Sequence, residues 1–88
     1  MASRHVMKTT RYFDEQVLRK RPYLTLDLCR AVLQSPLSKV IQPDGRIRFF
    51  GRVSDASGQA RILRVVTLAD GDTIHNAFFD RGFREQGE

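Results

Sequence analysis

The sequence has few of the residues on which disulfide frameworks, metal centres and membrane spans depend. Cys29 is the one cysteine, which excludes an internal disulfide and a multi-cysteine zinc site. Two histidines and scattered carboxylates give no metal-ligand pattern, so neither a metal nor a cofactor is expected. No apolar run approaches the roughly 18 residues of a membrane span. No signal-peptide pattern is visible either, and the sequence therefore predicts a cytoplasmic protein without a membrane partner.

Positive charge is what the sequence has in excess. The formal net charge is +5, and 12 of the 15 basic residues are arginine. Because the guanidinium group binds phosphates and carboxylates bidentately, such a surface suits RNA or an acidic protein as a partner. An ordinary solvated basic surface is the alternative. The 88 residues make one small domain with a limited core, which a weak homodimer would help to stabilise.

Two helices are predicted in the first half of the chain. Phe13 and Val17 share one face at helical spacing, which indicates a first helix that Pro22 ends. Thr25 is a favourable N-cap for a second helix, and Cys29 within it is expected to be a buried packing thiol. The expected divisions of the chain are a disordered segment over 1–10, a single domain over 11–84 and a tail over 85–88.

Three or four antiparallel strands are predicted in the second half, over 37–42, 46–53, 61–68 and 73–79. Asp70-Gly71 between the last two predicts a hairpin with a two-residue type I′ turn. The pairs expected across this hairpin are Thr67 with Ile74, Val66 with His75, Val65 with Asn76 and Arg64 with Ala77. The pairs expected between the two preceding strands are Arg48 with Val66, Phe50 with Arg64, Arg52 with Ile62 and Val53 with Arg61.

These pairs assign every strand residue to one of two sheet faces, because side chains alternate along a strand. The face predicted to lie under the helices carries Ile47, Phe49, Val53, Leu63, Val65, Thr67, Ile74, Asn76 and Phe78. The opposite, open face carries Arg46, Arg48, Phe50, Arg52, Ile62, Arg64, Val66, His75, Ala77 and Phe79. The predicted fold class is α+β, with two N-terminal helices packed on one face of a three- to four-stranded antiparallel sheet.

Several short motifs carry a family resemblance. They are Tyr12-Phe13-x-x-x-Val17-Leu18-Arg19-Lys20-Arg21-Pro22-Tyr23-Leu24, Asp44-Gly45-Arg46, Arg64-Val65-Val66-Thr67-Leu68 and Thr73-Ile74-His75-Asn76-Ala77-Phe78. Together they resemble a bacterial family of small uncharacterised proteins, over about residues 11–84. That family is similar in turn to the DUF4258 and BrnT-like members of the RelE/ParE toxin superfamily.

The resemblance implies a RelE/ParE-like sheet with N-terminal helices. It also implies a toxin that acts on RNA or the ribosome, as a ribosome-dependent or free ribonuclease, and an antitoxin protein that neutralises it. Members of the toxin group commonly carry a His-x-x-x-Arg pattern in the first helix. This chain departs from the pattern, because Glu15 lies four residues before Arg19.

His75 is the candidate catalytic residue on the open face. Cleavage of RNA without a metal needs a general acid or base and cations that stabilise the developing phosphorane charge. An imidazole titrates near neutral pH, and Arg48 and Arg64 could hold the phosphate. Tyr12 or Tyr23 could stack a base or donate a proton. The structural alternative is a half-buried His75 that hydrogen-bonds to a backbone carbonyl or to Asp80.

The arginine rows are the candidate nucleic-acid contacts. They comprise Arg46, Arg48, Arg52 and Arg64 on the sheet, and Arg19, Lys20 and Arg21 at the end of the first helix. Asp80 is expected to pair with this helix-end cluster or with Arg64.

The leading functional hypothesis is a toxin-like RNA-interacting protein of a toxin–antitoxin type system, with metal-independent endoribonuclease activity as its catalytic form. The alternative is a non-enzymatic module whose Arg-rich sheet face binds nucleic acid or an acidic protein. A small structural or regulatory protein that dimerises through a strand edge is a third possibility.

Overall fold

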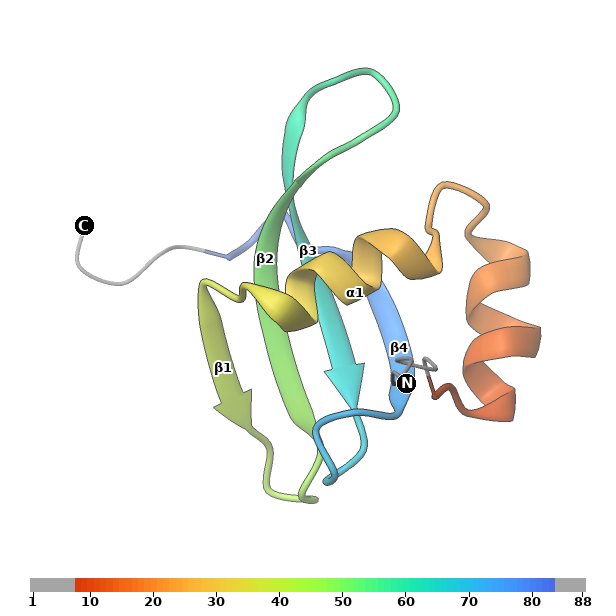
Figure 1. Ribbon diagram of the computed structural model, residues 1–88, viewed down its shortest axis with the longest axis vertical. Coiled ribbons are helices and arrows are strands. Elements are labelled where there is room, and N and C mark those ends of the chain that lie inside the picture. Colours follow the sequence, from red (N-terminus) through yellow and green to blue (C-terminus); the bar gives the residue numbers. More distant parts are fainter. Residues whose placement is uncertain (1–7, 84–88) are drawn as a thin grey trace, which may run out of the picture.

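The computed structural model describes residues 8–83 and has an α+β fold (Figure 1). Its four-stranded antiparallel sheet has the order β1-β2-β3-β4, which confirms the predicted class. The elements are η1 (Phe13–Leu18), α1 (Leu26–Gln34), β1 (Ser38–Ile41), β2 (Ile47–Ser54), β3 (Ala60–Thr67) and β4 (Ile74–Phe79). Most of the predicted N-terminal segment and the whole predicted tail lie outside the described residues. No helix within 8–83 is long and apolar enough to span a bilayer.

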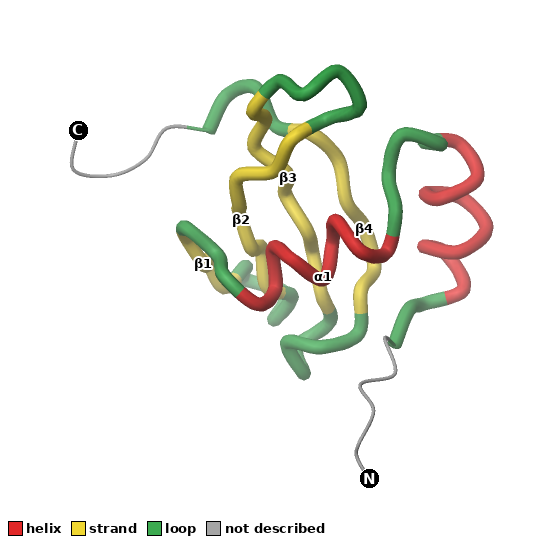
Figure 2. Tube along the Cα trace, turned by 45° about the horizontal axis from the view of Figure 1, so that its top comes forward, coloured by secondary structure: helices red, strands yellow, loops and turns green. Residues whose placement is uncertain are grey.

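The two helical elements lie on one side of the sheet, α1 across β2 and β3 and η1 beside β4 (Figures 1 and 2). Thr10 accepts a hydrogen bond from the backbone N–H of Phe13 at 3.1 Å, which satisfies a free donor at the start of the first helix. This helix is π-helical over η1 and α-helical in the residues that flank it. Thr25 caps α1 as predicted, and its Oγ1 accepts from the N–H of Leu28 at 3.1 Å.

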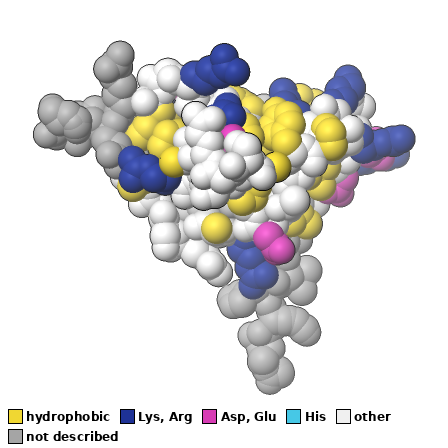
Figure 3. Space-filling view, turned by 90° about the horizontal axis from the view of Figure 1, so that it is seen from above, with side chains coloured by type: hydrophobic (Ala, Val, Ile, Leu, Met, Phe, Trp, Pro, Cys, Tyr) yellow, Lys and Arg dark blue, Asp and Glu magenta, His cyan; other side chains and the backbone are white. Residues whose placement is uncertain are grey.

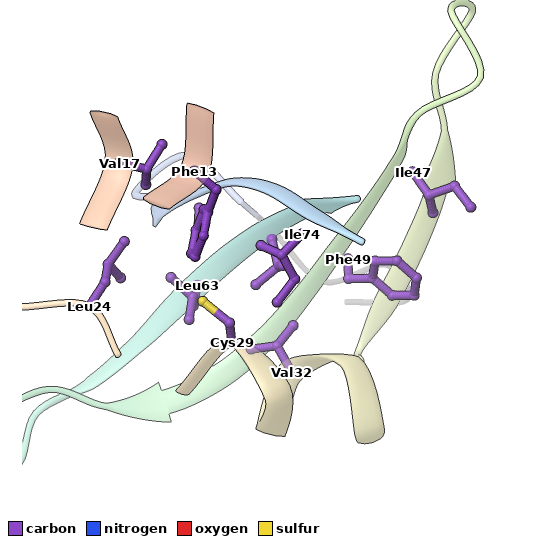
Figure 4. Packing of buried hydrophobic residues seen from close by; sticks show 11 residues of the cluster. Phe13, Val17, Leu24, Cys29, Val32, Ile47, Phe49, Leu63 and Ile74 are labelled. Carbon is purple, nitrogen blue, oxygen red and sulfur yellow. The ribbon is translucent and has the colours of Figure 1, made fainter. Parts of the chain in front are cut away.

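Seen from above, the molecule carries Lys and Arg side chains at many places around a partly hydrophobic surface (Figure 3). The core lies below this surface, between the helices and the sheet. Figure 4 shows side chains from η1, α1 and the strands meeting in a single layer. Its buried members are Phe13, Val17, Leu24, Cys29, Val32, Ile47, Phe49, Leu63, Val65, Ile74 and Ala77. Cys29 is the packing thiol that the sequence predicted, and burial raises its pKa to about 12.

Gly51 is the point where α1 comes closest to the sheet. A Cβ atom at this position would lie 2.9 Å from Cγ2 and 3.0 Å from Cγ1 of Val32. A larger residue would therefore push against a β-branched side chain that has little rotamer freedom. Glycine in the middle of β2 is needed for close helix–sheet packing rather than for a turn.

The register between β2 and β3 is the one predicted. Arg48 faces Val66, Phe50 faces Arg64, and Val53 faces Arg61. On the other side of β2, Val40 faces Arg48 and Ser38 faces Phe50. The alternation of polar and apolar residues in these strands therefore placed their side chains on the correct faces.

The hairpin between β3 and β4 differs from its prediction in the turn. Asp70 does not have the positive φ that a type I′ turn requires, whereas Gly71 has φ 69°. The N–H of Leu68 donates to the carbonyl of Thr73 at 2.9 Å, and this bond closes a four-residue loop. Asp70 accepts from the N–H groups of Asp72 and Thr73, both at 2.9 Å. Hydrogen bonds, first that from the Thr73 hydroxyl, lower the pKa of Asp70 to about 2.

A β-bulge then shifts the hairpin by one residue. Thr67 pairs with Ile74 as predicted, but Val66 pairs with Asn76 and Val65 with Ala77. The predicted Val66–His75, Val65–Asn76 and Arg64–Ala77 pairs are therefore wrong, and His75 is the extra residue at the irregularity.

The N-terminal segment is a backbone partner of β4 that the sequence pattern did not predict. Ile74 accepts from the N–H of Thr10 at 3.0 Å and donates to the carbonyl of Lys8 at 2.8 Å. Residues 8–10 thus add a short parallel bridge outside β4 and belong to the folded domain, which the sequence had started at residue 11.

The shift reverses the predicted faces of β4 from Asn76 onward, whereas Ile74 is buried in the core as predicted. Ala77 is buried in the core and Phe79 packs against it, whereas Asn76 and Phe78 share the opposite face with Val66 and Arg64. We call the face under η1 and α1 the helix face, and the other the open face. The open face comprises Val40, Arg48, Phe50, Arg52, Ile62, Arg64, Val66, Asn76 and Phe78.

Candidate nucleic-acid interface

Arg64 lies in the middle of the open face and contacts two aromatic rings and a carboxylate. Its Cζ lies 4.7 Å from the ring centroid of Phe78 and 5.3 Å from that of Phe50. Its Nε donates to Oδ2 of Asp80 at 3.0 Å, and its Nη2 donates to the same oxygen. The structure thus confirms the predicted ion pair with Asp80. Arg64 is a structural arginine whose charge is already balanced.

Asp80 is held ionised by this pair. Burial alone would raise the pKa of Asp80, but hydrogen bonds from Arg64 and from the N–H of Gly82, together with the charge of Arg64, lower it. Beside the pair, the ring of Phe83 stacks on Phe50 with centroids 4.6 Å apart. Phe83, at the end of the described chain, therefore packs on the open face.

Arg48 has a different environment one strand away. Its Nε donates to Oε1 of Gln42 at 2.8 Å, and the amide of Gln42 donates in turn to Asp44 at 3.2 Å. Within residues 8–83, no carboxylate forms an ion pair with Arg48. A neutral amide fixes the direction of the guanidinium group without balancing its charge.

Arg46, which directly precedes β2, and Arg52 within β2 lie to either side of Arg48 along the chain. Arg46 is half exposed and lies 3.8 Å from Asp44, a distance at which water screens most of the attraction. Arg52 is exposed on the same face, four residues along from Arg48. The predicted cations along β2 therefore lie in one row, whereas Arg64 is paired with Asp80 within the fold.

His75 takes its contacts from the N-terminal segment. Its Nδ1 lies 3.0 Å from Oγ1 of Thr10, and its ring lies 4.9 Å from that of Tyr12. Burial, and then the charge of Arg46, lower the pKa of His75 from 6.5, so the imidazole is mainly neutral at pH 7. Neither predicted hydrogen-bond partner is the one observed. The predicted approach to Arg64 depended on a pair with Val66 that the bulge abolishes.

Arg19, Lys20 and Arg21 lie at the end of the first helix, in the layer on the other side of the sheet from Arg48. Lys20 and Arg21 line a cavity of about 440 Å³ together with Tyr12, Gln16 and Tyr23. A second cavity of about 530 Å³ shares Tyr23 and contains Arg61, Phe79 and Arg81. These three residues had no functional role in the sequence prediction, which placed Phe79 on the wrong face.

The described part of the chain contains no ligand set for a metal ion. No group of three or more His, Cys, Asp or Glu side chains among these residues could hold a metal ion. What the arrangement offers is a row of cations on one sheet face, and aromatic rings beside cations in the helix layer.

Comparisons with known proteins add no family. No protein-family model matches the chain, and no significant match is found among curated proteins or solved structures. The resemblance to DUF4258 and RelE/ParE proteins therefore stays a prediction.

Proposed function

We propose that this protein is an RNA-binding module that contacts the phosphate backbone through its open sheet face. The observation that carries the proposal is the contrast between two arginines on neighbouring strands. Arg64 is balanced by Asp80, whereas Arg48 is oriented by the neutral Gln42. A fixed guanidinium with an uncompensated charge is suited to a phosphate, which it binds bidentately.

The surroundings of Arg48 support the same proposal. Arg46 and Arg52 extend the cationic row along β2, and the whole chain carries a net charge of +5. RNA supplies phosphates as a repeating series, and counterion release then makes binding strongly dependent on salt.

Catalysis is not included in this proposal. The catalytic hypothesis needed His75 beside Arg48 and Arg64, and the contacts of His75 are with Thr10 and Tyr12. Its Nδ1 already has a hydrogen-bond partner, and its neutral form is favoured. Phosphate binding by the β2 row requires none of these features.

The test is RNA binding measured by fluorescence anisotropy over a series of salt concentrations. Arg48→Ala should weaken binding and reduce the slope of log K against log salt by about one, because one phosphate contact is lost. Arg30→Ala is the matched control, since it removes the same charge from α1 on the other side of the sheet. Equal losses in both variants would reduce the proposal to a net-charge effect, and no binding at low salt would refute it.

A further inference from the structure

Tyr23 stands between two cavities in the helix layer. The cavity of about 440 Å³ lies on the side of η1, and the one of about 530 Å³ lies towards the β2–β3 loop. Both volumes fall within the range of roughly 300–1,000 Å³ that is common for small-molecule sites. Figure 3 looks onto the end of the molecule that carries the β2–β3 loop, where hydrophobic and Lys or Arg side chains lie next to one another. We call the two cavities together the tyrosine groove.

Each tyrosine of the groove is backed by another ring. The ring of Tyr23 stacks on Phe79 with centroids 5.2 Å apart and an angle of 20°, and the ring of Tyr12 lies 4.9 Å from His75. Both tyrosines are nevertheless 48% exposed. A ring held from behind and exposed in front is a preorganised stacking surface, because little side-chain entropy remains to be lost on binding.

Cations surround these rings. Lys20 and Arg21 line the first cavity, and Arg61 and Arg81 line the second. Arg61 lies 4.5 Å from the centroid of Phe79 and 3.3 Å from a carboxylate oxygen of Asp55. Four cations and one acidic side chain thus line the groove, which has a positive net charge.

We propose that the tyrosine groove binds single-stranded nucleic acid, with unpaired bases stacked on Tyr23 and Tyr12 and with phosphates near Lys20, Arg21 and Arg81. The inference rests on the proposed function in one respect, because it specifies the form of nucleic acid that the protein binds. Alternating aromatic rings and cations fit this ligand class, since every base has a π-face. A duplex hides those faces within its own stack, and an acidic peptide would use the cations only.

The composition of the chain provides a direct readout. Tyr12 and Tyr23 are its only two tyrosines and it has no tryptophan, so intrinsic fluorescence reports on the groove alone. Titration with a short uridine oligonucleotide should quench this fluorescence after correction for absorbance. A thymidine oligonucleotide should quench it as well, and tighter binding of uridine would identify RNA as the source. A duplex of equal length should quench it much less.

Two variants locate the site. Tyr23→Ala should weaken binding of the single strand by about 5- to 150-fold, the range that corresponds to stacking of one base. Tyr23→Phe keeps the ring and should bind nearly as wild type. Since Tyr23→Ala also removes the stack on Phe79, its melting temperature is measured alongside. Lys20→Ala leaves that stack intact and should reduce the salt slope by about 0.7, the value for one phosphate contact on a single strand.

The outcomes separate this inference from the proposed function. Weaker RNA binding by Arg48→Ala without any tyrosine quenching would overturn the groove and leave the open face standing. Tyrosine quenching combined with an RNA affinity that Arg48→Ala leaves unchanged would overturn the open face and leave the groove standing. Equal quenching by a polyglutamate peptide would identify an acidic-peptide site and overturn the inference, as would equal affinity for duplex and single strand. No binding of any nucleic acid would refute both.

Discussion

The two faces of the sheet are built from the same strands but are covered in different ways. On β3, Val65 faces the helices and is 0% exposed, and its neighbour Val66 faces the open side and is still only 8% exposed. Phe50, also on the open face, is 6% exposed. No helix lies over these residues among 8–83; on this side Arg64 and Phe83 pack on the ring of Phe50, and Arg64 also packs on the ring of Phe78.

A sheet face without a helix is therefore not necessarily exposed to solvent. Stacked arginine and phenylalanine side chains shield apolar atoms and leave their charged ends near water. The helix face is stabilised by apolar packing, which gives large and pH-independent contributions. The open face relies on an ion pair and on stacking, which contribute less and depend on pH. Four substitutions test this contrast, in order of decreasing expected effect.

The largest effect is expected for Leu63→Ala on the helix face. Leu63 is fully buried in the core, so its truncation should lower the free energy of unfolding by about 2–5 kcal/mol. Urea denaturation measures this change. Ile41→Ala is the control, because this edge-strand side chain is 68% exposed and should contribute no more than about 0.5 kcal/mol. Similar losses for both variants would contradict the assignment of the core.

Gly51→Ala tests the contact between α1 and β2. The new Cβ would meet the side chain of Val32 at 2.9 Å, and overpacking of this kind costs about 1–3 kcal/mol. The double variant Gly51→Ala with Val32→Ala makes room for the added methyl group. Its loss in unfolding free energy should be smaller than the sum of the two single losses. Strict additivity would show that α1 does not pack on Gly51.

These contacts also show how far the sequence determines the fold. The β2 and β3 runs alternate regularly between polar and apolar residues, so a slip of one residue would move the apolar side chains to the wrong face. The pairing of Arg48 with Val66 was therefore predictable. The Thr73–Phe79 stretch mixes polar and apolar residues and fits two registers equally well. The choice between them involves backbone bonds from Lys8 and Thr10 to Ile74, about 65 residues away along the chain. A local pattern contains no information about such a partner.

The candidate sites divide in the same way. The Arg64–Asp80 pair was foreseeable, because Asp80 follows the strand next to that of Arg64 and carries the opposite charge. The neutral partner of Arg48 depends on how Gln42 leaves β1, which no periodicity describes. The tyrosine groove needs the end of the first helix, the β2–β3 loop and the end of β4 in one place. Only the tertiary structure brings these segments together.

Asp80→Asn breaks the ion pair of the open face. The loss of a hydrogen bond between charged groups should cost about 1.5 kcal/mol near pH 7, less than either helix-face substitution at its upper range. Because the pKa of Asp80 is lower in the folded protein than the usual value of about 3.9, the stabilisation is fully present above that pH. It is lost as the pH falls through the folded pKa.

The stability of Asp80→Asn should therefore decline less than that of the wild type when the pH is lowered from about 4 to about 2. Urea denaturation at several acidic pH values measures the two curves. Asp72→Asn is the control, since this loop carboxylate is more than half exposed and lies 3.7 Å from Lys8 in an exposed pair. Parallel curves for Asp80→Asn and the wild type would show that the pair does not stabilise the open face.

The smallest effect on stability is expected for Arg48→Ala. Its one hydrogen bond, to the partly exposed Gln42, is with a neutral group, and its charge is not balanced by a carboxylate within residues 8–83. Truncation should change the free energy of unfolding by less than about 1 kcal/mol, in contrast to Arg64→Ala, which leaves Asp80 without its partner. RNA affinity should respond in the opposite order, because Arg48 is available to a phosphate and Arg64 is not. Urea denaturation measures the order of stability of the two variants, and fluorescence anisotropy measures the order of their RNA affinity. If Arg48→Ala unfolds more readily than Arg64→Ala, then Arg48 stabilises the sheet and is not available for a ligand.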